Sequence, residues 1–324
     1  MQKFEYHLEK FNTFLSKQNF SFEPHELYDP IAYTLALGGK RIRPVMALLS
    51  CNIFGGKYEN IINPAMGIEI FHNFTLLHDD IMDDAPIRRG KETVYRKWNS
   101  NIAILSGDTM FALAYKYITK TEPRFLANIL EVFNKTAIEV CEGQQLDMNY
   151  EDLDNVTIAD YLNMIRLKTA VFLGASLKIG AIIGETAQEN IDRIYCFGEH
   201  LGMAFQLQDD LLDVFGDEEK FGKQTGGDII TNKKTYLYLK AFELANGDSL
   251  EILKTNFIHN HPDQELKVKQ IKKVYADLEV DKYVQKEIFR YYNKALIYLD
   301  KIEVDADSKN ELKILADRLI KRDY

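Results

Sequence analysis

The chain reads AMGIEIFHNFTLL at Ala65–Leu77 and continues directly into HDDIMD at His78–Asp83. The first segment is apolar nearly all the way round a helix, which predicts a helix in the middle of a bundle. The second segment puts three carboxylates at the end of that helix, where residues i, i+1 and i+4 lie on one side. Acids beside an apolar segment are poorly hydrated unless a group pairs with them. This stretch therefore predicts a helical core with a charged site at its edge.

Helical periodicity extends over almost the whole chain and predicts an all-α fold. The 324 residues include only 7 prolines and 18 glycines, too few for the many turns of a sandwich or barrel. No linker or low-complexity stretch marks a boundary, so we expect one domain over residues 1–324, a single large helical bundle. The clearest predicted helices are Ile61–Asp84, Asn101–Thr119, Pro123–Asn149, Ile158–Ile183, Gln188–Phe215, Lys234–Leu244, Gln264–Leu278 and Lys282–Ile302.

Composition and charge narrow the class of function. The net charge of −9 argues against nucleic acid as a partner. The sequence contains no run of 18 uncharged apolar residues, so we expect no transmembrane segment, and the charged N-terminus lacks the apolar core of a signal peptide. Three cysteines, an odd number at distant positions, are typical of reduced thiols in a cytoplasmic protein: Cys51, Cys141 and Cys196.

A second acidic triplet, DDLLD at Asp209–Asp213, repeats the spacing of DDIMD at Asp79–Asp83. One such pattern arises by chance about once in a chain of this composition, but a solvated acidic face would have polar neighbours, and both triplets follow apolar segments. Oxygen ligands without His or Cys partners favour Mg²⁺, and two opposed aspartate sets would hold a diphosphate through metal ions. A di-iron site would need two Glu-x-x-His motifs on facing helices, and the chain has only one, at Glu69–His72. His78 before Asp79 also occurs in metal-dependent phosphohydrolases, although a lone histidine is more often a helix residue making a hydrogen bond.

Two basic clusters have the chemistry that phosphate binding needs. The segment GGKRIRP at Gly38–Pro44 places a lysine and two arginines after a glycine turn, and Arg88 and Arg89 follow the first acidic triplet. Arginine offers a fixed donor fork to phosphate, and lysine adds a point charge. For the first cluster alone, solvated surface charge is the simpler interpretation. Arg88 and Arg89 lie within reach of a phosphate bound to metal at the triplet, which favours a binding function.

Taken in order, these motifs resemble those of the trans-isoprenyl diphosphate synthase (polyprenyl synthetase) family, in particular the short-chain farnesyl and geranylgeranyl diphosphate synthases. The resemblance runs from residue 38 to 235 and also includes Gly143-Gln144 with Asp147, Lys168-Thr169, Phe205-Gln206, Phe221-Gly222-Lys223, Gly227-Asp228 and Lys233-Lys234-Thr235. It implies an isoprenoid synthase fold, a helical bundle around a central, largely apolar cavity. It also implies Mg²⁺ as the cofactor, with three ions when the allylic diphosphate is bound.

The resemblance implies a role for each matched residue. Asp79, Asp83 and Asp209 would bind metal directly, with Asp80 and Asp213 also at the metal site and Asp210 supporting them. Together with Lys168 and Lys223, these six aspartates form the expected catalytic set. The allylic diphosphate would be bound by Arg88, Lys168, Gln206, Lys223 and Lys233, and isopentenyl diphosphate by Lys40, Arg43, His72 and Arg89. Gly39 and Thr169 complete the expected substrate site. Gln224 departs from the proline of many members, which puts the rigidity of that loop in doubt.

The implied activity is the Mg²⁺-dependent condensation of isopentenyl diphosphate with dimethylallyl, geranyl or farnesyl diphosphate. By the family mechanism, bound metal would stabilise charge on the departing diphosphate and the isopentenyl double bond would attack the allylic cation. The departing diphosphate would then accept the proton that is lost, since no side chain stands out as the base. Three alternatives remain open: a class I terpene cyclase, a non-catalytic family subunit and a plain helical scaffold. The second triplet is unlike the metal motif of a cyclase, and a non-catalytic subunit should have lost an aspartate or arginine. The family forms homodimers, and the apolar segment Ala103–Ala114 is the candidate contact, although the same pattern also suits the core of a monomer.

Product length is predicted from the helix that bears the first triplet. In the family, an aromatic residue five positions before the first aspartate closes the pocket floor, and here that residue is Phe74, beside the small Thr75. At 1.5 Å per residue these two lie roughly 6–8 Å from Asp79 along the helix. The combination resembles geranylgeranyl synthases, so we expect a twenty-carbon product, with the fifteen-carbon product as the alternative. Under the opposing interpretation, Phe74 is only a core residue.

Overall fold

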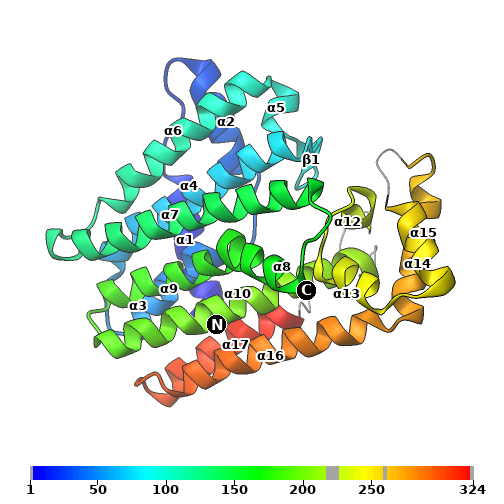
Figure 1. Cartoon of the computed structure of the whole chain (residues 1–324). Coiled ribbons are helices and arrows are strands. Elements are labelled where there is room, and N and C mark those ends of the chain that lie inside the picture. The colour runs from blue at the N-terminus through cyan, green and yellow to red at the C-terminus, as the bar shows by residue number, and fades with distance from the viewer. Residues whose placement is uncertain (1–2, 217–225, 258–260, 322–324) are drawn as a thin grey trace. The chain divides into compact units, whose positions relative to one another are not determined.

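The computed structural model describes residues 3–216, 226–257 and 261–321, and helices account for most of them (Figure 1). The only strands in these ranges are β1 (Ile87–Arg88) and β2 (Lys91–Glu92), which pair antiparallel as a small hairpin. The predicted all-α fold is confirmed. Within the same ranges, no helix combines the length and the apolar character that crossing a membrane requires.

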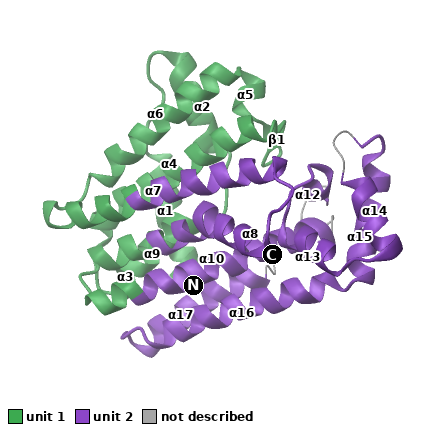
Figure 2. Cartoon of the chain, viewed as in Figure 1, with its two compact units in different colours: residues 1–134, 176–192 green, residues 135–175, 193–324 purple. Residues whose placement is uncertain are grey.

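The chain forms two compact units, and each is described by itself (Figure 2). Unit 1 comprises residues 1–134 and 176–192, and unit 2 comprises residues 135–175 and 193–324. Three helices contribute segments to both units: α7 (Pro123–Asp152), α9 (Val171–Ile183) and α10 (Gln188–Phe215).

Unit 1 is built around α4 (Tyr58–Met82), the predicted central helix, which has buried residues on all its faces. Its closest partner is α6 (Ser100–Ile118), because glycines remove side chains where the two helices meet. A Cβ atom on Gly67 would lie 2.8 Å from the Ala114 carbonyl oxygen, and one on Gly107 would lie 2.2 Å from His78 Nε2. The other helices of this unit are α1 (Lys3–Ser16), α2 (His25–Ala36), α3 (Ile42–Ile53) and α5 (Val94–Lys97).

Unit 2 packs around the C-terminal part of α10. Its apolar core includes Leu207 of α10 together with Leu237, Ile271 and Val284 from three later helices, all completely buried. The helices of this unit are α8 (Ile158–Ile165), α12 (Gly227–Ile230), α13 (Tyr236–Leu244), α14 (Gly247–Asn256), α15 (Gln264–Asp277), α16 (Val280–Asp300) and α17 (Ala306–Lys321). The π-helical turn η1 (Arg166–Ala170) follows α8 directly.

The predicted helices match the structure within three residues at each end. The prediction for Gln188–Phe215 is α10 itself, and Ile61–Asp84 corresponds to α4, which begins three residues earlier. The predicted helix Ile158–Ile183 is helical throughout, but η1 interrupts its α-helical period. The structure adds helices that were not among the predictions: α1, α2, α3, α5, α12, α14 and α17.

Candidate active site

The glycine turn before α3 brings the two basic clusters of unit 1 together. Gly38 and Gly39 have φ angles of +81° and +130°, which side chains other than glycine rarely adopt. A Cβ atom on Gly39 would lie 2.9 Å from the Arg89 guanidinium carbon, and Arg89 Nη1 donates a hydrogen bond to the Gly38 carbonyl. Arg89, from the turn of the hairpin, therefore lies directly against the segment that bears Lys40.

Arg41, the middle cation of this segment, is buried in the protein. Its Nη1 donates to Glu69 Oε1 of α4 and its Nη2 donates to the Leu35 carbonyl oxygen at 2.8 Å. The side chains of Arg41 and Glu69 are only 4% and 1% exposed. Asn73 Nδ2 donates to the same Glu69 oxygen at 2.8 Å. Arg41 therefore anchors the basic turn to α4, whereas Lys40 is exposed.

His72 contacts the third cation of the segment. Its Nε2 lies 3.2 Å from Arg43 Nη1, which can only donate. Burial, followed by the charges of Arg43 and Arg89, holds the pKa of His72 well below its ordinary value. The imidazole is therefore neutral with its proton on Nδ1, and it holds the Arg43 guanidinium as an acceptor. The residues expected to bind isopentenyl diphosphate thus lie together in unit 1: Gly39, Lys40, Arg43, His72 and Arg89.

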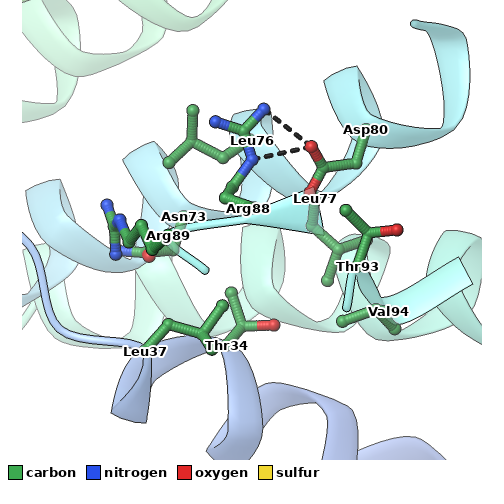
Figure 3. A pocket seen from close by; sticks show the side chains of 10 residues that line it. All are labelled: Thr34, Leu37, Asn73, Leu76, Leu77, Asp80, Arg88, Arg89, Thr93 and Val94. Atoms are coloured by element: carbon green, nitrogen blue, oxygen red, sulfur yellow. Dashed lines mark hydrogen bonds and ion pairs between the residues drawn. The ribbon is translucent and has the colours of Figure 1, made fainter. Parts of the chain in front are cut away.

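The first acidic triplet does not present its three carboxylates equally. Asp80 is 4% exposed, and both Nε and Nη2 of Arg88 contact its Oδ1 at 2.6 Å (Figure 3). Burial raises the pKa of Asp80 to about 6, although Arg88 opposes the shift. Asp79 is half-buried and Asp83, which follows the last residue of α4, is exposed. The middle aspartate is thus held inside, while its two neighbours remain accessible to a ligand.

A small pocket in unit 1 lies beside this ion pair. Asp80, Arg88 and Arg89 line it together with residues of α2, α4 and α5, and the two arginines diverge from each other, Arg88 toward Asp80 (Figure 3). Arg88 is therefore held by the first acidic triplet, and Arg89 is held by the glycine turn.

The second acidic triplet, in unit 2, repeats this division. Asp210 is 5% exposed, accepts a hydrogen bond from the Tyr161 hydroxyl and accepts another from Gln206 Nε2 at 3.0 Å. Burial raises the pKa of Asp210 to about 7, and these two hydrogen bonds oppose the shift. Asp209 and Asp213 are only half-buried. In both triplets, therefore, the middle aspartate has donors from the protein.

Two further aspartates belong to this acidic cluster. The backbone N–H of Asp228 donates to Asp213 Oδ2 at 3.0 Å, and Asp147 Oδ2 lies 2.5 Å from Lys168 Nζ. Burial and the charges of Asp210 and Asp213 raise the pKa of Asp228 well above its ordinary value. The sequence motifs contain Asp147 and Asp228, but no role was assigned to either. The sequence signal for a role of these two aspartates was their place in motifs that follow one another in the same order as in the family.

Lys168 and Thr169 lie in the π turn η1, a local structure that is frequent at functional sites. Two glycines let neighbouring helices approach this turn. A Cβ atom on Gly143 would lie 2.3 Å from the backbone nitrogen of Lys168, and one on Gly202 would lie 2.6 Å from the Cα atom of Ala170. The Thr169 hydroxyl also donates to Gln206 Oε1 at 3.1 Å.

The expected allylic site is therefore partly assembled in unit 2. Lys168, Thr169 and Gln206 lie around the second triplet, and the Lys233 backbone N–H donates to the Asp228 carbonyl at 2.9 Å. Arg88 belongs to unit 1. Lys223 and Gln224 lie outside the described residues.

The donor chemistry fits Mg²⁺. The more exposed carboxylates of both triplets offer oxygen ligands. Burial is the main cause of the raised pKa values of Asp80, Asp210 and Asp228, and a cation bound nearby would favour their ionised forms. Across the ranges that the structure describes, no three His, Cys, Asp or Glu side chains already converge with the geometry of a metal site. Metal binding at these positions thus stays a prediction.

Comparison with known proteins gives a consistent result. The family model described as polyprenyl synthetase matches residues 24–277. The geranylgeranyl pyrophosphate synthase of Geoglobus acetivorans is 37% identical over 318 residues, which cover 98% of this chain and 96% of that protein. The geranylgeranyl diphosphate synthase of Methanosarcina mazei is 36% identical over 303 residues, 93% of this chain and 91% of the relative.

A solved structure gives the same answer at the level of the fold. A crystal structure of a geranylgeranyl pyrophosphate synthase is 42% identical, covers 99% of both chains and superposes with a TM-score of 0.94. Both acidic triplets and both basic clusters fall inside the matched residues 24–277. The chain belongs to the polyprenyl synthetase family.

Proposed function

We propose that this chain is a short-chain trans-prenyltransferase that condenses isopentenyl diphosphate with allylic diphosphates and releases diphosphate. The observation that supports this function most strongly is the shared design of the two acidic triplets. In each, the middle aspartate is buried and bound by side-chain donors of the protein, and the two outer aspartates are more exposed. The relatives named geranylgeranyl synthases cover nearly the whole chain, which supports the same activity.

The accessible aspartates would hold Mg²⁺: Asp79, Asp83, Asp209 and Asp213. Bound there, Mg²⁺ would supply positive charge to the departing diphosphate. We assign the allylic diphosphate to Arg88, Lys168, Gln206, Lys223 and Lys233. The Asp147 carboxylate holds Lys168 Nζ at 2.5 Å, so this ammonium is oriented before substrate arrives.

Isopentenyl diphosphate is assigned to the cluster around the glycine turn. The neutral His72 orients the Arg43 fork through the 3.2 Å contact, and the Gly38 carbonyl orients Arg89. These two arginines and Lys40 present donors that match a diphosphate. Separate binding sites keep the nucleophile in a fixed orientation, which contributes to the rate as well as to affinity.

We propose a homodimer that forms through α6. This helix exposes Ile104 and Leu105, with 43% and 59% of their surfaces accessible, although its other face packs on α4. Burial of such side chains in a symmetric contact is favourable. Sedimentation at micromolar concentration should give the mass of two chains, and a fully active monomer would refute the proposal. On the odd number and wide spacing of the cysteines, we also propose a cytoplasmic location. Because no linker or low-complexity stretch marks a boundary in the sequence, we propose a single functional domain.

For product length we propose twenty carbons, with Phe74 as the floor residue and Thr75 leaving room beside it. The Phe74 ring lies 5.2 Å from the Phe111 ring, 5.6 Å from Phe71 and 4.8 Å from His78, measured between ring centroids. Phe74 is therefore one member of an aromatic cluster that joins α4 and α6, which supports a rigid floor.

A direct assay with two aspartate variants tests this function. The purified chain should convert isopentenyl and dimethylallyl diphosphates to longer prenyl diphosphates only when Mg²⁺ is present. Asp79→Ala and Asp209→Ala should each lower turnover by orders of magnitude, about 10²-fold or more, because each removes charge stabilisation in the transition state. Glu59→Ala, on the exposed first turn of α4, is the matched control and should keep normal turnover. Normal turnover in a folded Asp79→Ala protein would refute the assignment.

A further inference from the structure

A chain of hydrogen bonds in unit 2 begins at a residue that no sequence motif singled out. Tyr161, on α8, donates its hydroxyl hydrogen to Asp210 Oδ2. Gln206 Nε2 donates to the other carboxylate oxygen, Oδ1, at 3.0 Å. Thr169, in η1, donates its hydroxyl to Gln206 Oε1 at 3.1 Å. Three separate elements are thus joined by one polar chain.

The Asp210 carboxylate accepts both of its hydrogen bonds in this network, and this sets the direction of the hydrogen bonds that follow. The Tyr161 hydroxyl donates to Oδ2 of Asp210, and the nitrogen of the Gln206 amide, which can only donate, faces Oδ1. The amide oxygen then faces Thr169, whose hydroxyl must donate to it. The second N–H of Gln206 Nε2 and the lone pairs of the Thr169 hydroxyl oxygen therefore already have fixed directions before a substrate binds.

Tyr161 is buried among apolar residues of the unit 2 core, which include Met164, Leu207 and Leu211. A phenol hydroxyl in such surroundings is unfavourable unless it has a partner, and phenylalanine would fill the same space. The hydroxyl meets its partner at the middle aspartate of the acidic triplet. The position of the Tyr161 hydroxyl is therefore explained better by the orientation of the hydrogen-bonded side chains than by packing of the core.

We infer that Tyr161 is a positioning residue for the allylic diphosphate: acting through Asp210, it fixes the amide of Gln206 and the hydroxyl of Thr169. This inference rests on the proposed function, because it assumes that Gln206 and Thr169 contact that substrate. Tyr161 itself is buried, so it would act on the substrate only through Asp210. Without the Tyr161 hydroxyl, Oδ2 of Asp210 loses its donor and the carboxylate is free to rotate. The Gln206 amide, which donates to Oδ1 of the same carboxylate, then shifts with it, and its donor to the diphosphate is misdirected in part of the population.

The test uses Tyr161→Phe and an unreactive allylic thiolodiphosphate in the presence of Mg²⁺. Titration calorimetry should show binding of the analogue weakened about tenfold, as expected for one misdirected hydrogen bond to a charged group, with isopentenyl diphosphate binding unchanged. The matched control is Tyr292→Phe, because Tyr292 donates its hydroxyl to Asp317 in the same unit, away from the triplet. This control should bind both ligands as the wild type does.

A double-mutant cycle separates positioning from a general effect on the fold. In a Gln206→Ala background, Tyr161→Phe should cause no further loss of analogue affinity, because its effect passes through the missing amide. If Tyr161→Phe folds poorly, Asp210→Asn is the second variant that tests the inference. Its amide can donate as well as accept, so it should also weaken binding of the allylic analogue.

The outcomes distinguish this inference from the proposed function. If the wild type binds the analogue and Tyr161→Phe binds it equally well, only the inference is overturned. If the losses in the double mutant are additive, the route through Gln206 is wrong and the inference is overturned as well. If the wild type itself does not bind the analogue, the proposed function fails and the inference fails with it.

Discussion

The buried pair of Arg41 and Glu69 should contribute far more to stability than its place in a basic surface motif suggests. Both side chains are almost completely buried, so Glu69→Gln leaves the guanidinium without its counter-charge while the shape of the site is kept. Removing one partner of a buried pair costs about 3–5 kcal/mol of unfolding free energy, because the remaining charge is desolvated. The Leu35 carbonyl and the Asn73 amide remain in place, so the lower end of that range is expected.

Urea denaturation at a fixed protein concentration measures this effect. Glu59→Gln, an exposed acid on the same helix, is the control and should leave the midpoint unchanged. The double variant Arg41→Met with Glu69→Leu should recover much of the stability, since apolar residues of similar volume replace both charges. Because Arg41 lies between Lys40 and Arg43, Glu69→Gln should also raise the KM for isopentenyl diphosphate. A loss below about 1 kcal/mol would show that the pair is solvated and that the reasoning is wrong.

Three other predictions concern separate parts of the chain. Phe74→Ala should give products longer than those of the wild type by chromatography, whereas an unchanged product with a stability loss of about 3–5 kcal/mol would mean that Phe74 is only a core residue. Burial lowers the pKa of His7 from 6.5 to about 4, so the folded state resists protonation, and up to about 2–3 kcal/mol of stability present above pH 6.5 should be lost as the pH falls to 4. His7→Phe should flatten that acid slope in urea titrations, and an unchanged slope would contradict the assignment. Burial raises the pKa of Cys51 to about 12, so at pH 8 iodoacetamide should alkylate the exposed Cys141 and leave Cys51 unmodified in the native protein, and equal labelling would contradict this.

Local periodicity was sufficient to predict the longest helices. α10 has the predicted bounds because its apolar residues recur at helical spacing along its whole length, and α4 was identified as central because it is apolar on all faces. The π turn η1 was not predicted, since one extra residue in a helical turn hardly changes the apolar pattern. Its position depends on the approach of Gly143 and Gly202, which are distant in sequence.

The residues of the candidate site could be predicted from the motifs, and the resemblance implied a role for each, but the contacts of each side chain could not be predicted. Sequence spacing gives Asp79, Asp80 and Asp83 the same chance of facing a ligand. Only the structure shows that the hairpin returns Arg88 to Asp80. In the same way, Arg41 cannot be distinguished from its neighbours until Glu69, 28 residues away, is seen to lie beside it. Such distinctions come from tertiary contacts, which a motif does not encode.

The central claim is that this chain elongates an allylic diphosphate with isopentenyl diphosphate through two aspartate triplets. The most direct measurement is chromatography of the products formed from radiolabelled isopentenyl diphosphate and dimethylallyl diphosphate, with and without Mg²⁺. The account predicts a Mg²⁺-dependent product of mainly twenty carbons, lost together with activity in Asp79→Ala and Asp209→Ala. A folded wild-type protein that forms no elongated product with Mg²⁺ present, or one that forms it equally well in both variants, would contradict the account.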